Sequence, residues 1–201
     1  ADRLHNMSTI SSLPADKRVV IANETMDIYA PLAGRLGMAD MRWRLEDLAF
    51  RELNPEQYKG IADLLTENRA FRETYIEQVR RALSTALVKS GISFKIVGRA
   101  KHIYSIHQKR VKYETMGRSV DSVYDLYALR VFVDTISDCY AVLGAVHQLW
   151  RPIPGEFDDY IANPKPNLYQ SLHTTVNCLD NNPLEIQVRT YEMDAIAEHG
   201  V

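Results

Sequence analysis

The stretch 184–190, LEIQVRT, alternates apolar and polar residues. Successive side chains of a strand point to opposite faces, so this pattern predicts a strand with one core face and one polar face. The polar face carries Glu185, Gln187 and Arg189, and it is either exposed to solvent or the floor of a cleft. A glutamate held on a rigid strand is well placed as a metal ligand or a general base.

Other strand and helix patterns surround this stretch in the second half of the chain. The predicted strands are 92–99, 127–134, 170–178 and 183–190, the predicted helices are 101–113, 136–150 and one that begins at Tyr191, and 151–167 is predicted as a loop rich in Pro and Gly. Elements in this order predict an α+β fold, in which helices pack on a mixed β-sheet.

The first half of the chain has helical patterns only. The expected helices are 14–37, 38–53 and a long helix that begins at Pro55 and ends at the Ser-Gly pair 90–91. Asn54 is a cap residue and Pro55 suits the first helical position. We therefore expect a helical segment over 1–90 and a second domain over 91–201.

Composition narrows the class of protein. The chain has 201 residues, 46% hydrophobic and 25% charged, with a formal net charge of −2, which is typical of a globular protein and argues against a general nucleic-acid binder. Nothing in the chain resembles a signal peptide or an apolar run of roughly 20 residues, so a cytoplasmic location is expected. The chain starts without Met, and we expect it to be a piece of a longer protein.

Basic residues concentrate between residues 95 and 118. This segment holds seven Lys or Arg residues and one acidic residue, an excess of six positive charges. Such a focus suggests an anion site, although a solvated helix face is the alternative. Within it, Lys101, Ser105 and Lys109 are four residues apart and are expected to share one helix face near the helix N-terminus, where phosphate binds well. Arg99, in the loop before that helix, could clamp a phosphate or stack on a base.

The segment 163–174, NPKPNLYQSLHT, carries many side chains suited to a nucleotide. Lys165 could meet phosphate, Asn167 could contact a base or sugar edge, and Tyr169 offers a stacking plane. His173 by itself would more often be a structural histidine. Asp125 would converge with Glu185 if strand 127–134 neighbours strand 184–190, and Mg²⁺ needs only a few such oxygen ligands. By itself, Asp125 would be read as a turn or cap residue.

Together these stretches resemble the RelA/SpoT family, the stringent-response enzymes that make (p)ppGpp. The resemblance rests on GRAKHIYSIHQKR (98–110), YDLYALRVFVD (124–134), IPGEFDDYIANPKPNLYQSLHTTV (153–176) and PLEIQVRTYEMDAIAEHG (183–200), in this order. Residues 24–50 are similar to the family's linker between hydrolase and synthetase, and ADRLHNM (1–7) is similar to the tail of its HD-type hydrolase domain.

The resemblance implies a nucleotidyltransferase-like mixed sheet of five strands with flanking helices, preceded by a helical linker. It implies transfer of the β,γ-pyrophosphate of ATP to the ribose 3′-oxygen of GDP or GTP, with release of AMP. The implied roles are Mg²⁺ binding and catalysis for Asp125 and Glu185, ATP binding for Arg99, Lys101, Ser105 and Lys109, and guanine-nucleotide binding for Lys165, Asn167, Tyr169, His173 and Gln187.

Two features depart from a simple match. The acidic EFDD motif, with Glu156, Asp158 and Asp159, replaces the basic form usual in relatives with both activities, and it is the form of synthetase-only relatives. In the hydrolase pattern Asp2 would bind Mn²⁺ and Asn6 would contact nucleotide, but the other ligands are absent from this chain. We therefore expect no (p)ppGpp hydrolysis by this chain, although the parent protein could hydrolyse it.

Two other functions fit parts of the pattern. The chain could be a non-catalytic module that binds guanine nucleotides, which an assay for AMP and ppGpp would distinguish. A template-independent RNA nucleotidyltransferase shares the fold class, but usually has closely spaced paired aspartates that are not found at Asp125. Ribosome and tRNA are the partners that the resemblance implies for the C-terminal domains of a longer parent protein.

Overall fold

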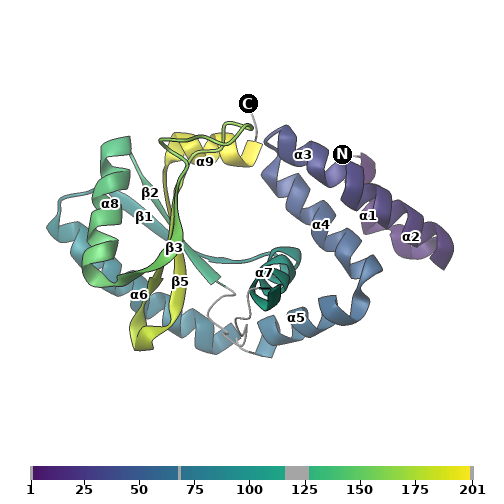
Figure 1. The fold of residues 1–201 in the computed structure, drawn as a ribbon, viewed down its shortest axis with the longest axis horizontal. Helices are drawn as coiled ribbons and strands as arrows, with labels where there is room; N and C mark the ends of the chain where they lie inside the picture. The colour runs from purple at the N-terminus through teal and green to yellow at the C-terminus, as the bar shows by residue number, and fades with distance from the viewer. Residues whose placement is uncertain (1, 68, 116–126, 200–201) are drawn as a thin grey trace. The chain divides into compact units, whose positions relative to one another are not determined.

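The computed structural model describes residues 2–67, 69–115 and 127–199 (Figure 1). Contacts between residues divide the chain into two compact units. The first unit contains helices α1 to α5 and α7, and the second contains the β-sheet with α6, α8 and most of α9. In the described part of the chain, no helix is both long enough and apolar enough to cross a membrane.

The first unit is built from helices. Its elements are α1 (Asp2–Ser8), η1 (Ile10–Ser12), α2 (Ala15–Glu24), η2 (Thr25–Tyr29), α3 (Ala30–Arg35), α4 (Ala39–Leu53), α5 (Pro55–Glu67) and α7 (Ile103–Thr115). The apolar faces of α1, η1, α2, α3 and α4 form one core, which contains Met7, Ile10, Ala22, Ala30, Leu45 and Ala49. The helical character predicted for the first half of the chain is confirmed.

A π-helical turn interrupts the helix predicted over 14–37. In η2 the N–H of Ala30 donates to the carbonyl of Thr25, five residues earlier. Pro31 explains this widening, because a proline inside a helix lacks an N–H and its ring crowds the carbonyl four residues before it, here that of Asp27. The wider turn lets the chain continue from α2 into α3 without a break.

Helix α7 packs on α4 through aromatic side chains. Phe50 of α4 stacks on the ring of His107, with 4.5 Å between centroids, and Trp43 stacks on His102 at 4.6 Å. Phe50 is almost fully buried. These contacts place α7 in the first unit, although it follows the first strand of the sheet in the sequence. The domain division near residue 91 stays a prediction.

The second unit is built on the predicted mixed sheet of five strands. Its strands are ordered β1-β2-β5-β4-β3, and only the β2–β5 pair is parallel. The elements are α6 (Arg69–Lys89), β1 (Phe94–Ala100), β2 (Tyr127–Val133), α8 (Ile136–Leu149), β3 (Arg151–Asp159), β4 (Leu172–Asn177), η4 (Leu179–Asn181), β5 (Pro183–Thr190) and α9 (Tyr191–His199).

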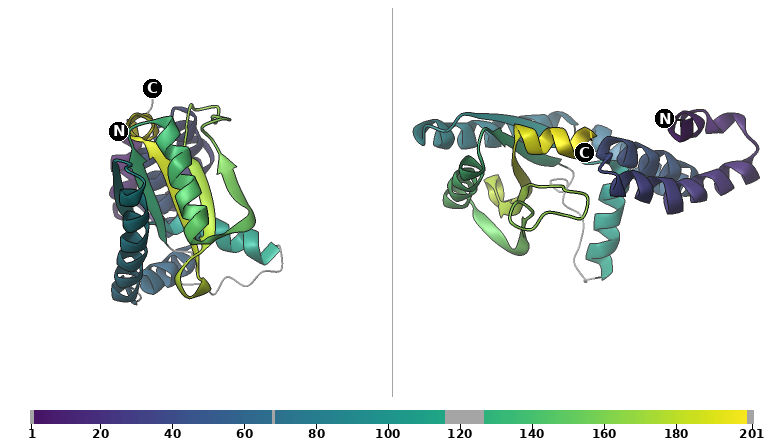
Figure 2. Two further views of the ribbon diagram at one scale, coloured as in Figure 1. Left: turned by 90° about the vertical axis from the view of Figure 1, so that its left-hand side faces the viewer. Right: turned by 90° about the horizontal axis from the view of Figure 1, so that it is seen from above.

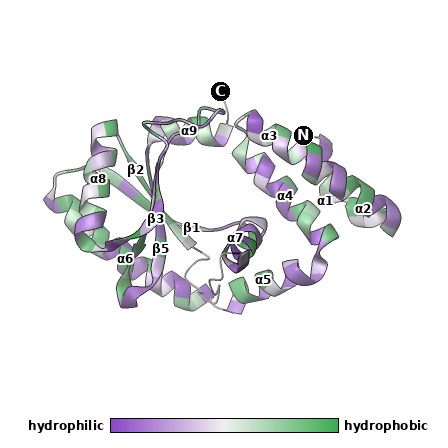
Figure 3. Ribbon diagram, viewed as in Figure 1, coloured by the Kyte–Doolittle hydropathy of each residue, from purple (hydrophilic) through white to green (hydrophobic). Residues whose placement is uncertain are grey.

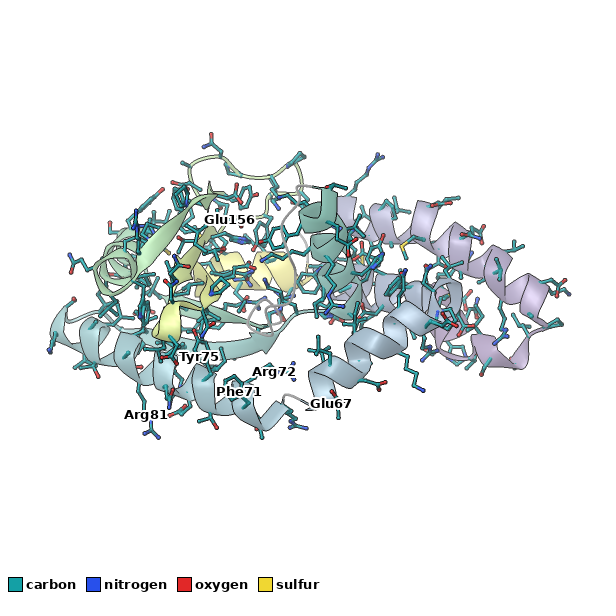
Figure 4. All side chains as sticks on the ribbon, turned by 60° about the horizontal axis from the view of Figure 1, so that its bottom comes forward. Glu67, Phe71, Arg72, Tyr75, Arg81 and Glu156 are labelled. Carbon is teal, nitrogen blue, oxygen red and sulfur yellow. The ribbon has the colours of Figure 1, made fainter. Side chains whose placement is uncertain are left out.

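Helices α6 and α8 cover the apolar face of the sheet. Figures 1 and 2 show α8 running along one face of the strands, and Figure 3 shows hydrophobic residues on both helices beside hydrophilic ones. In Figure 4, Arg81 projects outward from α6, whereas Tyr75 of the same helix is buried. The shared core contains Val79, Leu83, Leu87, Leu129, Val131, Val142, Val146, Leu172, Ile186 and Val188.

Residues 151–159 form a strand, so the prediction of a continuous loop over 151–167 was wrong. Strand β3 lies at the edge of the sheet, where Pro152 and Pro154 can be accommodated because one side of an edge strand needs no N–H donors. Its register with β4 shifts between Pro152 and Phe157, and Gly155 within the shift has a φ of 80°. The prolines and the glycine therefore mark an irregular edge strand.

The long helix predicted from Pro55 to the Ser-Gly pair is described as two helices. Helix α5 ends at Glu67 and α6 begins at Arg69, while Asn68 lies outside the described residues. The helical pattern on either side of residue 68 is as predicted. The two halves of the predicted helix belong to different compact units.

Candidate active site

The polar face of the sheet gathers charged residues from four strands. In the strand register, Glu185 of β5 lies opposite Ala128 of β2 and Thr175 of β4, and Ala128 lies opposite Arg99 of β1. Residues directly opposite one another share a face, as do residues two apart on one strand. The face that carries Glu185 therefore also carries Arg99, Arg130, His173, Gln187 and Arg189.

Glu185 is at the centre of this polar face. Its Oε2 lies 2.7 Å from Nζ of Lys101, and its Oε1 accepts a hydrogen bond of 2.7 Å from Nε2 of Gln187. Nδ1 of His173 is 3.7 Å from the same Oε1. The side chain of Glu185 is 20% exposed, so these contacts lie largely out of water.

Glu185 is ionised at neutral pH in spite of its burial. Burial raises the pKa of this carboxyl, but the charges of Lys101 and His173 and hydrogen bonds from Lys101 and Gln187 outweigh it and lower the pKa to about 2. Of the two charges, only that of Lys101 persists at neutral pH, because His173 is then uncharged. An ionised carboxylate can accept a proton or hold a cation, so the chemistry predicted for Glu185 is available to it.

His173 links Glu185 to the aromatic ring of Tyr169. Burial, followed by the nearby cations, lowers the pKa of His173 to about 4, although the charge of Glu185 raises it. Nε2 of His173 is 2.8 Å from the hydroxyl of Tyr169. Burial also raises the pKa of Tyr169, which therefore keeps its proton. These contacts favour a neutral imidazole that accepts from Tyr169 and presents Nδ1–H towards Glu185.

The proline-rich segment 163–170 is held in a compact turn. The N–H of Leu168 donates to the carbonyl of Lys165 at 2.8 Å, and the N–H of Lys165 donates to the carbonyl of Tyr169 at 3.2 Å. The amide oxygen of Asn167 accepts from the N–H of Tyr169 at 3.3 Å. Leu168 has a φ of 61°, an uncommon value for a non-glycine residue. The turn places Lys165 and Tyr169 on the same side of the segment.

Tyr160 is a neighbour of these residues that the sequence did not point out. Nζ of Lys165 lies 4.2 Å from the centre of its ring and 5.3 Å from that of Tyr169. The rings of Tyr160, Tyr169 and His173 meet edge to face, with centroids 5.3 to 6.1 Å apart. The attraction of a lysine ammonium to two aromatic rings gives its side chain a defined direction. Tyr160 follows the EFDD motif directly, and that position was its only signal in the sequence.

Arg99, Arg130 and Arg189 share this polar face, and of these only Arg99 was predicted as a site residue. Arg99 lies within strand β1, not in a loop, because the strand continues to Ala100 and Arg99 pairs with Ala128. Burial, then the charges of Arg130 and Arg189, lower the pKa of Arg99 to about 10. Arg130 and Arg189 are 8% and 2% exposed. The signal for Arg130 was a single arginine inside an otherwise apolar strand, and the signal for Arg189 was its place on the polar face of the alternating strand 184–190.

Lys101 and helix α7 differ from the predicted arrangement. Lys101 lies before the helix, which begins at Ile103, so the predicted common helix face applies to Ser105 and Lys109 alone. Ser105 and Lys109 belong to the first unit, whereas Lys101 belongs to the second. At the helix N-terminus the N–H of Tyr104 already donates to Oδ1 of Asp47, at 2.8 Å. The N-terminus of this helix was expected to favour phosphate, and in this structure a carboxylate of α4 caps one of its amides.

The EFDD residues lie at the end of β3, and Glu156 is labelled there in Figure 4. Oδ1 of Asp159 accepts from the N–H groups of Ile161 and Ala162 at 3.0 and 2.8 Å, and its Oδ2 accepts from the hydroxyl of Tyr140 at 3.0 Å. Asp158 lies opposite His173 in the strand register. Asp159 thus holds the chain as it leaves the strand, whereas Asp158 is exposed.

The predicted metal ligands are only partly within the described residues. Strand β2 pairs with β5, so the neighbouring arrangement required for the predicted carboxylate pair is present, but Asp125 itself lies outside the described residues. Among the residues that the structure describes, no group of three or more His, Cys, Asp or Glu side chains is arranged to hold a metal ion. Asp2 and Asn6 are exposed on α1.

Comparison with known proteins gives the family. The model for a region found in RelA / SpoT proteins matches residues 98–201, which include the end of β1 and strands β2 to β5. The chain belongs to the RelA/SpoT family. A second model, for an HD domain, matches residues 1–39. The family expected from the sequence is confirmed in both parts of the chain.

Curated relatives of this RelA/SpoT chain match it along its full length. The bifunctional (p)ppGpp synthase/hydrolase RelA of Mycobacterium tuberculosis is 46% identical over 201 residues, which are 100% of this chain and 27% of the relative. The GTP pyrophosphokinase of Streptomyces coelicolor is 48% identical, over 100% of this chain and 23% of the relative. The chain therefore spans about a quarter of the length of these relatives.

Solved structures also resemble the chain. The small alarmone synthetase 1 from Bacillus subtilis, bound to its product pppGpp, is 22% identical, with a TM-score of 0.49 over 70% of this chain and 80% of that chain. The small alarmone synthetase 2 of the same organism is 29% identical, with a TM-score of 0.43 over 61% of this chain and 72% of that chain.

Proposed function

We propose that this RelA/SpoT chain is a (p)ppGpp synthetase, which transfers the β,γ-pyrophosphate of ATP to the 3′-oxygen of GDP or GTP and releases AMP. The observation that carries the proposal is the ionised, largely buried Glu185 among Lys101, His173 and Gln187 on one rigid strand face. The names of relatives that match the whole chain support it. The division into a helical segment over 1–90 and a synthetase domain over 91–201 is part of the proposal.

The proposed role of Glu185 is to activate the 3′-hydroxyl of the guanine nucleotide. A carboxylate with a pKa of about 2 is a weak base in the resting protein, because Lys101 pairs with it. When Lys101 turns to the ATP phosphates, that stabilisation is lost and the carboxylate becomes more basic. The ion pair thus keeps both groups in position until substrate competes for the lysine.

The guanine nucleotide is proposed to bind along the segment 163–173. Tyr169 would stack on the base, Asn167 and Gln187 would supply polar contacts, and Lys165 would meet phosphate. The turn that fixes Lys165 and Tyr169 before substrate arrives reduces the entropy lost on binding. His173 would hold the Tyr169 hydroxyl and border the reacting carboxylate. Asp158 and Glu156 would tune the choice between GDP and GTP.

ATP is proposed to bind beside Arg99 and Lys101, with Ser105 and Lys109 of α7 contacting its phosphates. Pyrophosphate transfer depends on neutralising charge and holding the reacting atoms in line, more than on covalent help from the protein. Lysine and arginine side chains supply such charge, and Arg99 has in addition a planar guanidinium that can stack on a base.

The proposal includes Mg²⁺ held by Glu185 and Asp125. An ionised carboxylate is the oxygen ligand that Mg²⁺ prefers, and Glu185 fits this role because it is charged and fixed on a strand. When bound, Mg²⁺ would neutralise phosphate charge during transfer. Mn²⁺ at Asp2 would belong to the hydrolase of a longer protein, and no hydrolysis is proposed for this chain. A cytoplasmic location, and ribosome and tRNA as partners of a longer protein, complete the proposal and rest on the family resemblance.

An assay that measures both products directly tests the proposed function. The protein is incubated with ATP, GDP or GTP, and Mg²⁺, and AMP and the guanine product are separated chromatographically. We expect AMP and ppGpp or pppGpp in equal amounts. Glu185→Gln should lower kcat by about 10²- to 10⁴-fold, since it removes the proposed base without changing the shape of the side chain. Asp180→Asn, an exposed position on the same hairpin, is the control and should retain full activity.

A non-catalytic guanine-nucleotide-binding module is the second candidate. The observation that favours it is the Lys101–Glu185 pair, in which the groups proposed for phosphate and for base or metal satisfy each other. The same assay decides between the two: binding of GDP without any AMP release would establish the module and refute the synthetase.

A further inference from the structure

Asp194 contacts both Arg130 and Arg189 of the polar face. It lies in the first turn of α9, and its Oδ1 accepts a hydrogen bond of 3.3 Å from Nη1 of Arg130. Nε of Arg189 is 3.2 Å from the same oxygen. The side chains of Arg130 and Arg189 are 10% and 2% exposed, and that of Asp194 is 25% exposed. One carboxylate therefore holds two largely buried guanidinium groups that come from different strands.

The arginines need such a partner because they repel one another. The strand register places Arg99, Arg130 and Arg189 on one face of three neighbouring strands, and the guanidinium groups of Arg130 and Arg189 meet at one oxygen of Asp194. Buried like charges are costly unless an opposite charge compensates them, and a guanidinium takes a defined direction when it is bonded to a carboxylate. A shared acid both lowers the repulsion and fixes the direction of the two planar groups.

Asp194 is itself held rigidly. The hydroxyl of Thr190 accepts from the N–H of Met193 at 3.2 Å and so caps α9. Met193 is buried in the core of the second unit, and the ring of Tyr191 stacks on Phe132 of β2 with 5.7 Å between centroids. The first turn of α9 is thus fixed on both sides of the carboxylate. These contacts fix the backbone that carries the carboxylate of Asp194 next to the two arginines.

The two arginines reach different parts of the polar face. The Cζ atom of Arg189 is 5.7 Å from the ring centre of Tyr169, which is the proposed guanine platform. Arg130 is on β2, next to the strand that carries Arg99, which is proposed to contact ATP. We propose that Asp194 is a positioning residue shared by both nucleotide subsites, which orients Arg189 for the guanine nucleotide and Arg130 for ATP. This inference rests on the proposed function.

Steady-state kinetics of the variants Asp194→Ala, Asp194→Asn and Glu192→Gln test the proposal. Misplaced binding groups weaken substrate binding, so Asp194→Ala should raise KM for ATP and for GDP about 10- to 100-fold, with a smaller change in kcat. Asp194→Asn retains an oxygen that can accept from Arg130 and should raise both KM values only about threefold. Glu192 is exposed in the same first turn, so Glu192→Gln should match the wild type in both constants. The thermal unfolding temperature of each variant is measured in parallel, to show whether the variant is folded.

The outcomes separate this inference from the proposed function. KM values within twofold of wild type in Asp194→Ala, a rise for one nucleotide only, or an equal rise in Glu192→Gln would overturn the shared role. If Asp194→Ala does not fold, Asp194→Asn decides, and unchanged KM values in it overturn the inference. If wild-type protein releases no AMP, the proposed function fails. The role of Asp194 is then decided by calorimetric titration with GDP and with a non-hydrolysable ATP analogue, in which the same ranking of variants is expected. A wild type that binds neither nucleotide overturns both.

Discussion

At the scale of single residues, the environment of a side chain decides its chemistry. Glu185 and Glu77 both have a pKa of about 2, yet for different reasons. Glu77 is on the surface of α6, where hydrogen bonds from Arg80 and Arg81 lower its pKa. Glu185 is largely buried and relies on Lys101 and its strand neighbours. Exposed ion pairs contribute little to stability, whereas removing a partner from a buried charge is costly.

The ring of Tyr169 should matter more than its hydroxyl. Tyr169→Ala removes the proposed stacking plane and should weaken GDP binding by about 10- to 100-fold, as expected for loss of one base–aromatic stack, with a much smaller effect on ATP. Tyr169→Phe keeps the ring and loses the hydroxyl that contacts His173, so it should weaken GDP binding about threefold. Calorimetric titration with each nucleotide measures this, and equal losses for ATP and GDP in Tyr169→Ala would refute the stacking role.

At the scale of elements, single residues decide where a helix begins and how closely a strand can pack against a helix. Asp47 caps α7 from another helix through the N–H of Tyr104. Asp47→Ala should therefore lower the free energy of unfolding by about 1 kcal/mol, a usual value for a lost N-cap. Asp63→Ala, at an exposed position of α5, should change it by less than about 0.5 kcal/mol. Urea denaturation followed by circular dichroism compares them, and equal values for the two variants would show that the cap is unimportant.

Gly98 allows β1 to approach α6. A Cβ atom at this position would lie 2.8 Å from Cγ2 of Ile76, so Gly98→Ala should lower the free energy of unfolding by about 1–3 kcal/mol. Ile76→Leu removes that branch of the side chain and should recover part of the loss in the double variant, a coupling of about 0.5–3 kcal/mol. Gly144→Ala, in an open position on α8, should instead stabilise the protein by roughly 0.5–1 kcal/mol.

The free energy of unfolding of the Gly98 and Ile76 variants is measured by urea denaturation. The signal is the fluorescence of Trp150, which lies in the core of the same unit. Strictly additive effects of Gly98→Ala and Ile76→Leu would contradict the proposed contact.

At the scale of the whole molecule, the two cysteines report on the packing of the second unit. Both are free and buried, and burial raises the pKa of Cys139 to about 12 and of Cys178 to about 11. The thiolate is the reactive form, so neither should react with a thiol reagent at pH 8 in the folded protein, and both should react after unfolding, when the pKa returns to about 8.5. Rapid labelling of either cysteine in the native state would contradict this packing.

The raised pKa values of the Cys139 and Cys178 thiols also predict that stability depends on pH. A thiol whose folded pKa is above its unfolded value contributes stability that is fully present below about pH 8.5. That contribution is lost as the pH rises towards the folded values of about 11 and about 12. Urea midpoints measured from pH 7 to pH 10 should therefore fall at the alkaline end, and Cys139→Ala should show a smaller fall than the wild type.

Much of the second unit could be predicted because its signals are local. Strand alternation in 184–190 identified the core face and the polar face, and the structure has both. The strands around it were also found, with boundaries that moved by two residues at most for β1 and β4. The edge strand β3 was missed because Pro152, Pro154 and Gly155 indicate a loop in any local reading. Only their position at the edge of the sheet makes a strand possible.

Local pattern by itself determined the helical first half, the alternation of β5, and the segment that holds Lys165 and Tyr169. Each of these depends on residues close together in the chain. Only the tertiary structure decided that β2 pairs in parallel with β5, that Arg130 and Arg189 meet at Asp194, and that α7 packs on α4. These arrangements join residues that are distant in sequence, and they form only where burial and charge pairing repay the entropy of bringing such segments together.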